Sequence, residues 1–235
     1  MAFGVLNYAF GIVMISAYAC TAVTLRRYLR QRSNFVLSFV LFLLAYGTAA
    51  ATYFFRGFFV RWDPMEMALW MTQNYFYVLM ASSFALFMLY PLIQEQLGRR
   101  SRHLLIATIA GVIAVSILNV ILISTLGVAH TYTDYYGVEH YAFEYPSGSG
   151  NYLVYYYTLA ADVMMVSIGL ALLAVSYRRE TDAFYRRRTL MLLAGVALTT
   201  YGQLFLLTNA LAILTPFTSI AGTVLMSLGV VPRRK

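Results

Sequence analysis

The stretch NFVLSFVLFLLAYGTAAATYFF, residues 34–55, contains no charged side chain and is bounded by Arg32 and Arg56. An apolar segment of about 20 residues is long enough to cross the hydrocarbon core of a bilayer as an α-helix. Similar apolar runs fill the rest of the chain rather than a single window of it. The sequence therefore predicts an all-α integral membrane protein with several crossings.

The composition supports this fold class. Of the 235 residues, 61% are hydrophobic and 11% are charged, whereas a soluble domain is about half apolar and about a quarter charged. This balance excludes a soluble enzyme, a disordered protein and a disulfide-stapled secreted domain. Cys20 is the single cysteine, so the sequence offers no disulfide framework and no cysteine-based metal site. The first apolar run has no basic residue ahead of it, so we expect an uncleaved helix rather than a signal peptide.

The length predicts a bundle of about seven transmembrane helices in a single domain, residues 1–235, because each crossing needs roughly 20 residues. The expected spans are 2–25, 34–55, 65–97, 104–126, 152–177, 189–207 and 213–231. Ser33 is expected to cap the second helix. The expected inner loops are 26–33, 98–103 and 178–188, and the one long outer loop is 127–151.

The basic residues indicate how the helices are oriented. Of 17 lysines and arginines, 15 fall into four clusters: Arg26, Arg27, Arg30 and Arg32; Arg99, Arg100 and Arg102; Arg178, Arg179, Arg186, Arg187 and Arg188; Arg233, Arg234 and Lys235. Each cluster flanks an apolar run, as the positive-inside rule requires of cytoplasmic anchors. Seven crossings place all four clusters on one side, with the N-terminus outside and the C-terminus in the cytoplasm. The net charge of +8 is therefore a topology signal, and we expect the lipid bilayer of the cell membrane, not nucleic acid, as partner.

The outer loop, residues 127–151, is crowded with tyrosine and phenylalanine. These residues favour strands, and Gly137 would suit a turn between two of them, so the loop could form a hairpin that covers the outer face of the bundle. Tyrosine rings also rest at the headgroup level of membranes as an aromatic belt. The sequence leaves both interpretations open.

One acidic residue, Asp162, lies about ten residues into the fifth helix, or about 15 Å from its start. A carboxylate near the middle of a bilayer costs roughly 2.5–3.5 kcal/mol on insertion scales. Such residues usually face the bundle interior and mark functional sites, but a protonated carboxyl also serves as an interhelical hydrogen-bonding group. Both roles stay open for Asp162.

The third helix carries a second concentration of polar residues. At spacings of three and four, one helical face contains Glu66, Trp70, Gln73 or Asn74, and Tyr77. In lipid that face must point toward other helices. It would either line a ligand cavity, opposite Gln203 and Asn209 of the sixth helix, or pack through interhelical hydrogen bonds.

The expected helices lack the residues that common cofactors, metals and catalytic mechanisms require. The last helix has no lysine for a retinal Schiff base, and His103, His130 and His140 all fall in loops, away from the positions of haem or metal ligands. No nucleophile elbow or phosphate-binding glycine loop is present. We therefore expect no enzyme, no metal and no covalent cofactor. A bound lipid, quinone or carotenoid stays open, because apolar grooves hold such molecules without diagnostic residues.

Three stretches resemble the seven-helix sensor module at the N-terminus of many bacterial and archaeal histidine kinases and diguanylate cyclases. They are Asn119 and His130 before the aromatic loop, Tyr185 to Arg188 followed by Leu190 to Gly195, and Thr215-Pro216 with Gly229 in the last helix. In that family the module continues into an output domain, whereas this sequence ends at Lys235. The resemblance implies a detached sensor that signals through a partner. It implies no defined ligand and therefore no site residues.

Three classes of function follow. We expect a receptor-like sensor that acts on a cytoplasmic signalling partner. The alternatives are an accessory structural subunit that contacts other membrane proteins in a larger complex, and a small transporter that uses Asp162 as its coupling site. The segment from Arg178 to Arg188 is either the docking surface for the cytoplasmic partner or a solvated topology anchor.

Overall fold

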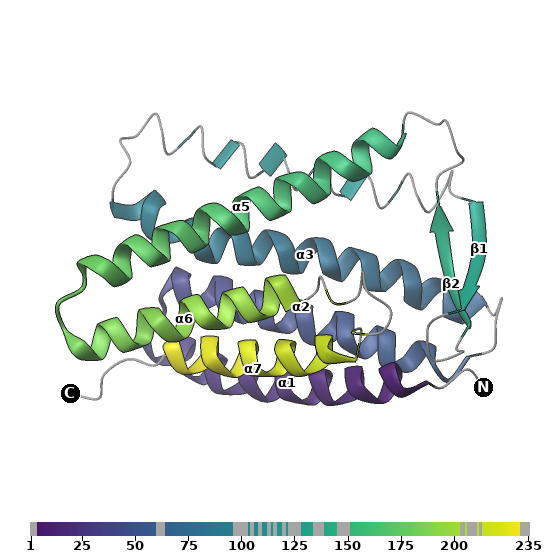
Figure 1. Cartoon of the computed structure of the whole chain (residues 1–235), viewed down its shortest axis with the longest axis horizontal. Coiled ribbons are helices and arrows are strands. Elements are labelled where there is room, and N and C mark those ends of the chain that lie inside the picture. The colour runs from purple at the N-terminus through teal and green to yellow at the C-terminus, as the bar shows by residue number, and fades with distance from the viewer. Residues whose placement is uncertain are drawn as a thin grey trace.

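The computed structural model of the chain describes residues 4–59, 64–95, 128–133, 139–144, 151–202 and 213–230, with single residues between 103 and 121 and at 205 and 211. The elements are α1 (Val5–Gln31), α2 (Asn34–Arg56), α3 (Pro64–Glu95), β1 (Val128–Thr133), β2 (Glu139–Glu144), α5 (Asn151–Arg179), α6 (Ala183–Tyr201) and α7 (Leu214–Gly229). The described part of the chain is thus helical, with a two-stranded hairpin between α3 and α5 (Figure 1). The predicted fourth helix, 104–126, lies mostly outside the described residues. Those that are described within it have helical backbone.

Two of the predicted inner loops are wrong in extent. The expected loop 26–33 is largely helix, because α1 continues to Gln31. The next residue, Arg32, is the C-cap and has a φ of 46°. The expected loop 178–188 shrinks to residues 180–182, between α5 and α6. Arginine is a good helix former, and its charge is favourable in the last turn of a helix, so basic residues extended the helices instead of ending them. Ser33 is at the N-cap of α2 but makes no capping hydrogen bond there.

Two strands within the segment predicted as the long outer loop form an antiparallel pair. In the register of β1 and β2, Val128 pairs with Glu144 and Thr133 with Glu139. The prediction of two short strands is therefore confirmed, while Gly137 lies outside the described residues. That the hairpin acts as a cover for the bundle stays a prediction.

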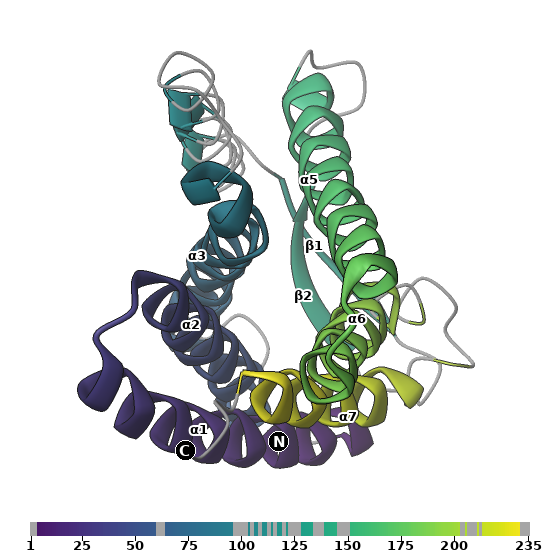
Figure 2. The same cartoon turned by 90° about the vertical axis from the view of Figure 1, so that its left-hand side faces the viewer.

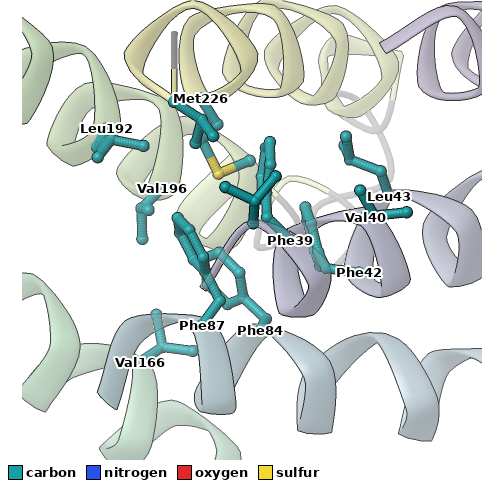
Figure 3. Close-up of a cluster of buried hydrophobic side chains, with 12 residues drawn as sticks. Phe39, Val40, Phe42, Leu43, Phe84, Phe87, Val166, Leu192, Val196 and Met226 are labelled. Carbon is teal, nitrogen blue, oxygen red and sulfur yellow. The ribbon is translucent and has the colours of Figure 1, made fainter. Parts of the chain in front are cut away.

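The described helices contact one another in the order in which they follow along the chain, and we call this arrangement a ring. Contacts join α1 to α2, α2 to α3, α3 to α5, α5 to α6 and α6 to α7, and α7 returns to α1 (Figure 2). Apolar side chains fill the space between α2, α3, α5, α6 and α7 (Figure 3): Val36, Phe39, Val40, Phe42, Leu43, Phe84, Phe87, Val166, Leu192, Val196, Met226 and Val230. Phe39 and Phe87 bring α2 and α3 together with ring centroids 4.9 Å apart. This core holds the ring in one arrangement, because closely packed aromatic rings leave few alternatives.

Helices α6 and α7 approach each other closely along a seam of small residues. A Cβ atom added at Gly195 would lie 2.7 Å from the carbonyl oxygen of Gly222, and one added at Gly229 would lie 3.1 Å from that of Arg188. The Thr215 hydroxyl donates a hydrogen bond of 3.2 Å to the carbonyl oxygen of Gly202. Glycine and hydroxyl residues at such a seam are typical of helix pairs in membranes, where close backbone approach replaces the hydrophobic effect.

Two described helices, Val5–Arg30 and Val36–Arg56, are long and apolar enough to cross a membrane, and Leu214–Gly229 is a shorter apolar helix. Figure 1 shows the hairpin at the same end of the bundle as the start of α1, and the connection between α5 and α6 at the opposite end. We refer to these as the hairpin end and the arginine end. The described basic clusters lie on the last turns of α1 and α5 and the first turns of α6, which are at the arginine end.

Candidate functional site

A buried ion pair joins α2 to α3 at the hairpin end. The Nε and Nη2 atoms of Arg56 donate to one carboxylate oxygen of Glu66, over 3.0 and 2.7 Å, and Nη1 donates to the amide oxygen of Gln73 over 3.3 Å. The side chains of Arg56 and Glu66 are each only 9% exposed. We call Arg56, Glu66 and Gln73 the buried polar cluster.

The local sequence explains how the three residues meet. Arg56 is the last residue of α2, and Glu66 lies in the first turn of α3. An acidic side chain is favourable there because the N-terminus of a helix carries partial positive charge. Gln73 follows Glu66 by seven residues, or about two helical turns, and so lies on the same face of α3.

A second polar contact fastens α1 at the same end. The Asn7 side chain donates from Nδ2 to the carbonyl oxygen of Tyr53 over 2.9 Å, and its Oδ1 accepts from the backbone N–H of Gly4 over 3.0 Å. Asn7 is buried, and Tyr53 lies one turn before Arg56 in α2. Side-chain hydrogen bonds therefore tie α1, α2 and α3 together at the hairpin end.

At the arginine end, two arginines complete the C-terminus of α7. Arg27 of α1 donates from Nη1 to the carbonyl oxygen of Ser227 over 3.1 Å, and Arg188 of α6 donates from Nε to that of Gly229 over 2.8 Å. The last carbonyls of a helix have no intrahelical donor and carry partial negative charge, so cations are favourable there. We call Arg27 and Arg188 the α7 cap. It joins three helices at one point.

The charges of the cap affect one another. Burial lowers the pKa of the Arg188 guanidinium, with Tyr185 acting to raise it and the positive charge of Arg27 acting to lower it. Arg188 also lies over the rings of Phe184 and Tyr185, and Arg186 lies 4.8 Å from the ring centroid of Tyr177. The cation–π contact of Arg186 joins α6 to Tyr177 of α5, whereas those of Arg188 lie within α6.

The predicted polar face of α3 is confirmed as far as it is described, because Glu66, Trp70 and Gln73 are all buried. Asn74, Tyr77 and Asp162 lie in α3 and α5, but their side chains, like the whole of Gln203, lie outside the described residues. Their predicted meeting inside the bundle stays a prediction. α3 and α5 are nevertheless neighbours in the ring.

Of the predicted basic anchors, Arg26, Arg178, Arg179, Arg186 and Arg187 are exposed at the arginine end. Arg27 and Arg188 are partly buried. Arg99 and Arg100 lie outside the described residues.

Sequence reasoning missed the role of Arg56, which lies just beyond the expected span 34–55. The available signal was its isolation, since it and Arg61 are the two basic residues outside the four clusters. A lone arginine next to an apolar run, with a glutamate ten residues further on, favours an ion pair. The α7 cap was also missed, because backbone carbonyls as acceptors leave no trace in the sequence.

One carboxylate oxygen of Glu66 accepts from two guanidinium nitrogens, and such an arrangement fixes a helix pair rather than activating a nucleophile. Within the described part of the chain, no group of three histidine, cysteine, aspartate or glutamate residues is placed to hold a metal ion.

No protein-family model matches the sequence, and no curated protein matches it.

Proposed function

We propose that the chain is a seven-helix protein of the cell membrane, with its N-terminus outside and its C-terminus in the cytoplasm. It senses a signal at the hairpin end and passes it to a partner at the arginine end, without catalysis of its own. The membrane location is supported by the distribution of side chains. Ile12 and Ile15 of α1 are 58% and 65% exposed, whereas Thr24, Thr215 and Thr223 are fully buried. A helix in water would place its polar side chains outward.

The observation that carries the sensor proposal is the buried polar cluster. Ionisable groups buried in a membrane protein are costly and commonly functional. This cluster lies at the end where a ligand from outside would arrive, and it joins α2 to α3. A change in the Arg56–Glu66 pair would therefore shift two helices of a ring whose other members carry the α7 cap.

A sensor requires the two ends to be coupled, which a single reporter can test. In a Cys20→Ser background, a cysteine placed at Thr181, an exposed residue between α5 and α6, reports on the arginine end. Glu66→Gln neutralises the pair with little change in size. Thr72→Ala on the same helix is the control, because its hydroxyl donates only to the carbonyl oxygen of Ala68 one turn earlier.

We expect Glu66→Gln to change the thiol-labelling rate at position 181 about fivefold or more, in line with usual allosteric coupling energies. Thr72→Ala should leave the rate unchanged. Equal rates in both variants, together with purification from native membranes in fixed stoichiometry with other integral membrane proteins, would instead identify an accessory subunit. Equal rates with a monodisperse lone protein that takes up cations in vesicles would identify a transporter.

A further inference from the structure

A small basic pocket lies beside the α7 cap, on the last turns of α1. Its volume is about 350 Å³, and it is lined by Val23, Arg26, Arg27 and Arg30. Sites for small molecules usually measure about 300–1,000 Å³, so this pocket fits a small group rather than a large soluble ligand. Arg26 and Arg30 are exposed and lie one helical turn apart, on the same face of α1.

The pocket concentrates positive charge without a described counter-charge. Within the described part of the chain, none of its three arginines forms an ion pair, and Arg188 adds a fourth positive charge near Arg27. Like charges one turn apart on a helix destabilise it. An anion with several oxygens would relieve this repulsion, and the planar fork of guanidinium matches phosphate oxygens.

The position of the pocket along α1 matches the level of lipid phosphates. The helix from Val5 to Leu25 is about 30 Å long at about 1.5 Å per residue, which is the thickness of the hydrocarbon core. Arg26, Arg27 and Arg30 therefore follow at headgroup depth. Val23 lines the pocket toward the apolar side and is 52% exposed, so it offers contact to an acyl chain.

We infer that this pocket binds the phosphate of an acidic membrane lipid. The chemistry recognised is a phosphate anion, with the lipid as its source because an apolar surface adjoins the arginines. A headgroup bound here would hold Arg27 between lipid and α7 and so strengthen the α1–α7 contact that closes the ring. The inference rests on the membrane location in the proposed function, but on neither sensing nor the inside–outside orientation.

The test uses the full chain purified in an uncharged detergent, with its thermal unfolding midpoint as readout. Three probes are titrated separately: dihexanoylphosphatidylglycerol, dihexanoylphosphatidylcholine and inorganic phosphate. The pocket variant is Arg26→Gln/Arg30→Gln, which leaves the α7 cap intact. The matched control is Arg178→Gln/Arg179→Gln, which removes the same charge from two exposed arginines of α5 at the same end. Val23→Trp is a second pocket variant that blocks the space and keeps the charge.

We expect the phosphatidylglycerol to raise the midpoint saturably, with an apparent affinity about tenfold weaker in both pocket variants and unchanged in the control. Equal weakening in the control and the pocket variant would overturn the site in favour of general charge attraction. The same stabilisation by inorganic phosphate would overturn the lipid as the source, and the same stabilisation by phosphatidylcholine would overturn recognition of the anion. None of these results depends on the labelling rate at position 181, so sensing can fail independently.

Discussion

Arg56 and Glu66 show how much a single buried charge depends on its partner. Arg56→Met would leave the Glu66 carboxylate buried without its guanidinium, and breaking one side of a buried pair costs about 3–5 kcal/mol. Replacing both, in Arg56→Met/Glu66→Leu, removes the unpaired charge, so most of that loss should return. We expect the single variant to have a much lower unfolding midpoint in detergent than the double variant.

The control for this comparison is Arg178→Met, which removes an exposed arginine and should change the midpoint little. If the stability lost in the double variant equals the sum of the losses in Arg56→Met and Glu66→Leu, the two side chains are not energetically coupled.

Asp162 is the second residue whose role a conservative change can separate. If its carboxyl serves only as a hydrogen-bonding group toward other helices, Asp162→Asn should be nearly as stable and active as the wild type. Asp162→Leu should then lose about 1–3 kcal/mol, because a buried polar partner is left unsatisfied. The measurements are the unfolding midpoint and the labelling rate at position 181.

Met164, two residues further along α5 and 58% exposed, supplies the control, since Met164→Leu should be neutral. Stabilisation by Asp162→Leu would mean that the side chain faces lipid and that its predicted inward orientation is wrong. A folded Asp162→Asn protein without function would assign the residue to cation or proton binding.

At the scale of elements, the α6–α7 seam tolerates no added atom. A Cβ at Gly222 would lie 2.7 Å from the carbonyl oxygen of Gly195 and would also clash with Thr199. Gly222→Ala must therefore push the two helices apart, at a cost of about 1–3 kcal/mol. Gly111→Ala is the matched control, because no atom of the described residues lies within 4 Å of its added Cβ. We expect that variant to gain about 0.5–1 kcal/mol, as alanine is the better helix former.

Both midpoints are measured by thermal unfolding in the same detergent. If Gly222→Ala were as stable as the wild type, the close approach of α6 and α7 would be wrong.

The sequence predicted that the described helices exist, because long apolar runs bounded by arginines indicate their presence. It failed at the helix ends. Arg26, Arg27 and Arg30 were assigned to a loop on the basis of charge, yet α1 continues through them. Hydropathy indicates where a helix leaves the hydrocarbon core of the bilayer. The helix itself can continue beyond that level into the headgroup region.

The candidate site was predicted only in part. Periodicity placed Glu66, Trp70 and Gln73 on a common buried face, which the structure confirms. It gave no partner for that face, because the position of Arg56 depends on how α2 and α3 meet at the hairpin end. Contacts between separate helices depend on the tertiary structure, which the spacing of residues within one helix does not predict.

At the scale of the whole molecule, the placement of the arginine clusters makes the orientation testable. In the Cys20→Ser background, a cysteine at Asp134, between the two strands, should react with a membrane-impermeant reagent in intact cells. A cysteine at Thr181 should react only after the membrane is opened. Thr181 is preferred to Asp182, whose carboxylate caps α6 by accepting from the N–H groups of Phe184 and Tyr185. The opposite labelling pattern would refute the proposed N-out, seven-helix topology.

The ring order of the helices has a consequence for how the protein is made. Because α2 packs on α1 and α3 packs on α2, these contacts can form while the ribosome is still adding later segments. The contact between α1 and α7 cannot form until α7 has been synthesised. Until α7 has been made, the Arg27 guanidinium lacks the carbonyl oxygen of Ser227 to which it donates in the folded protein.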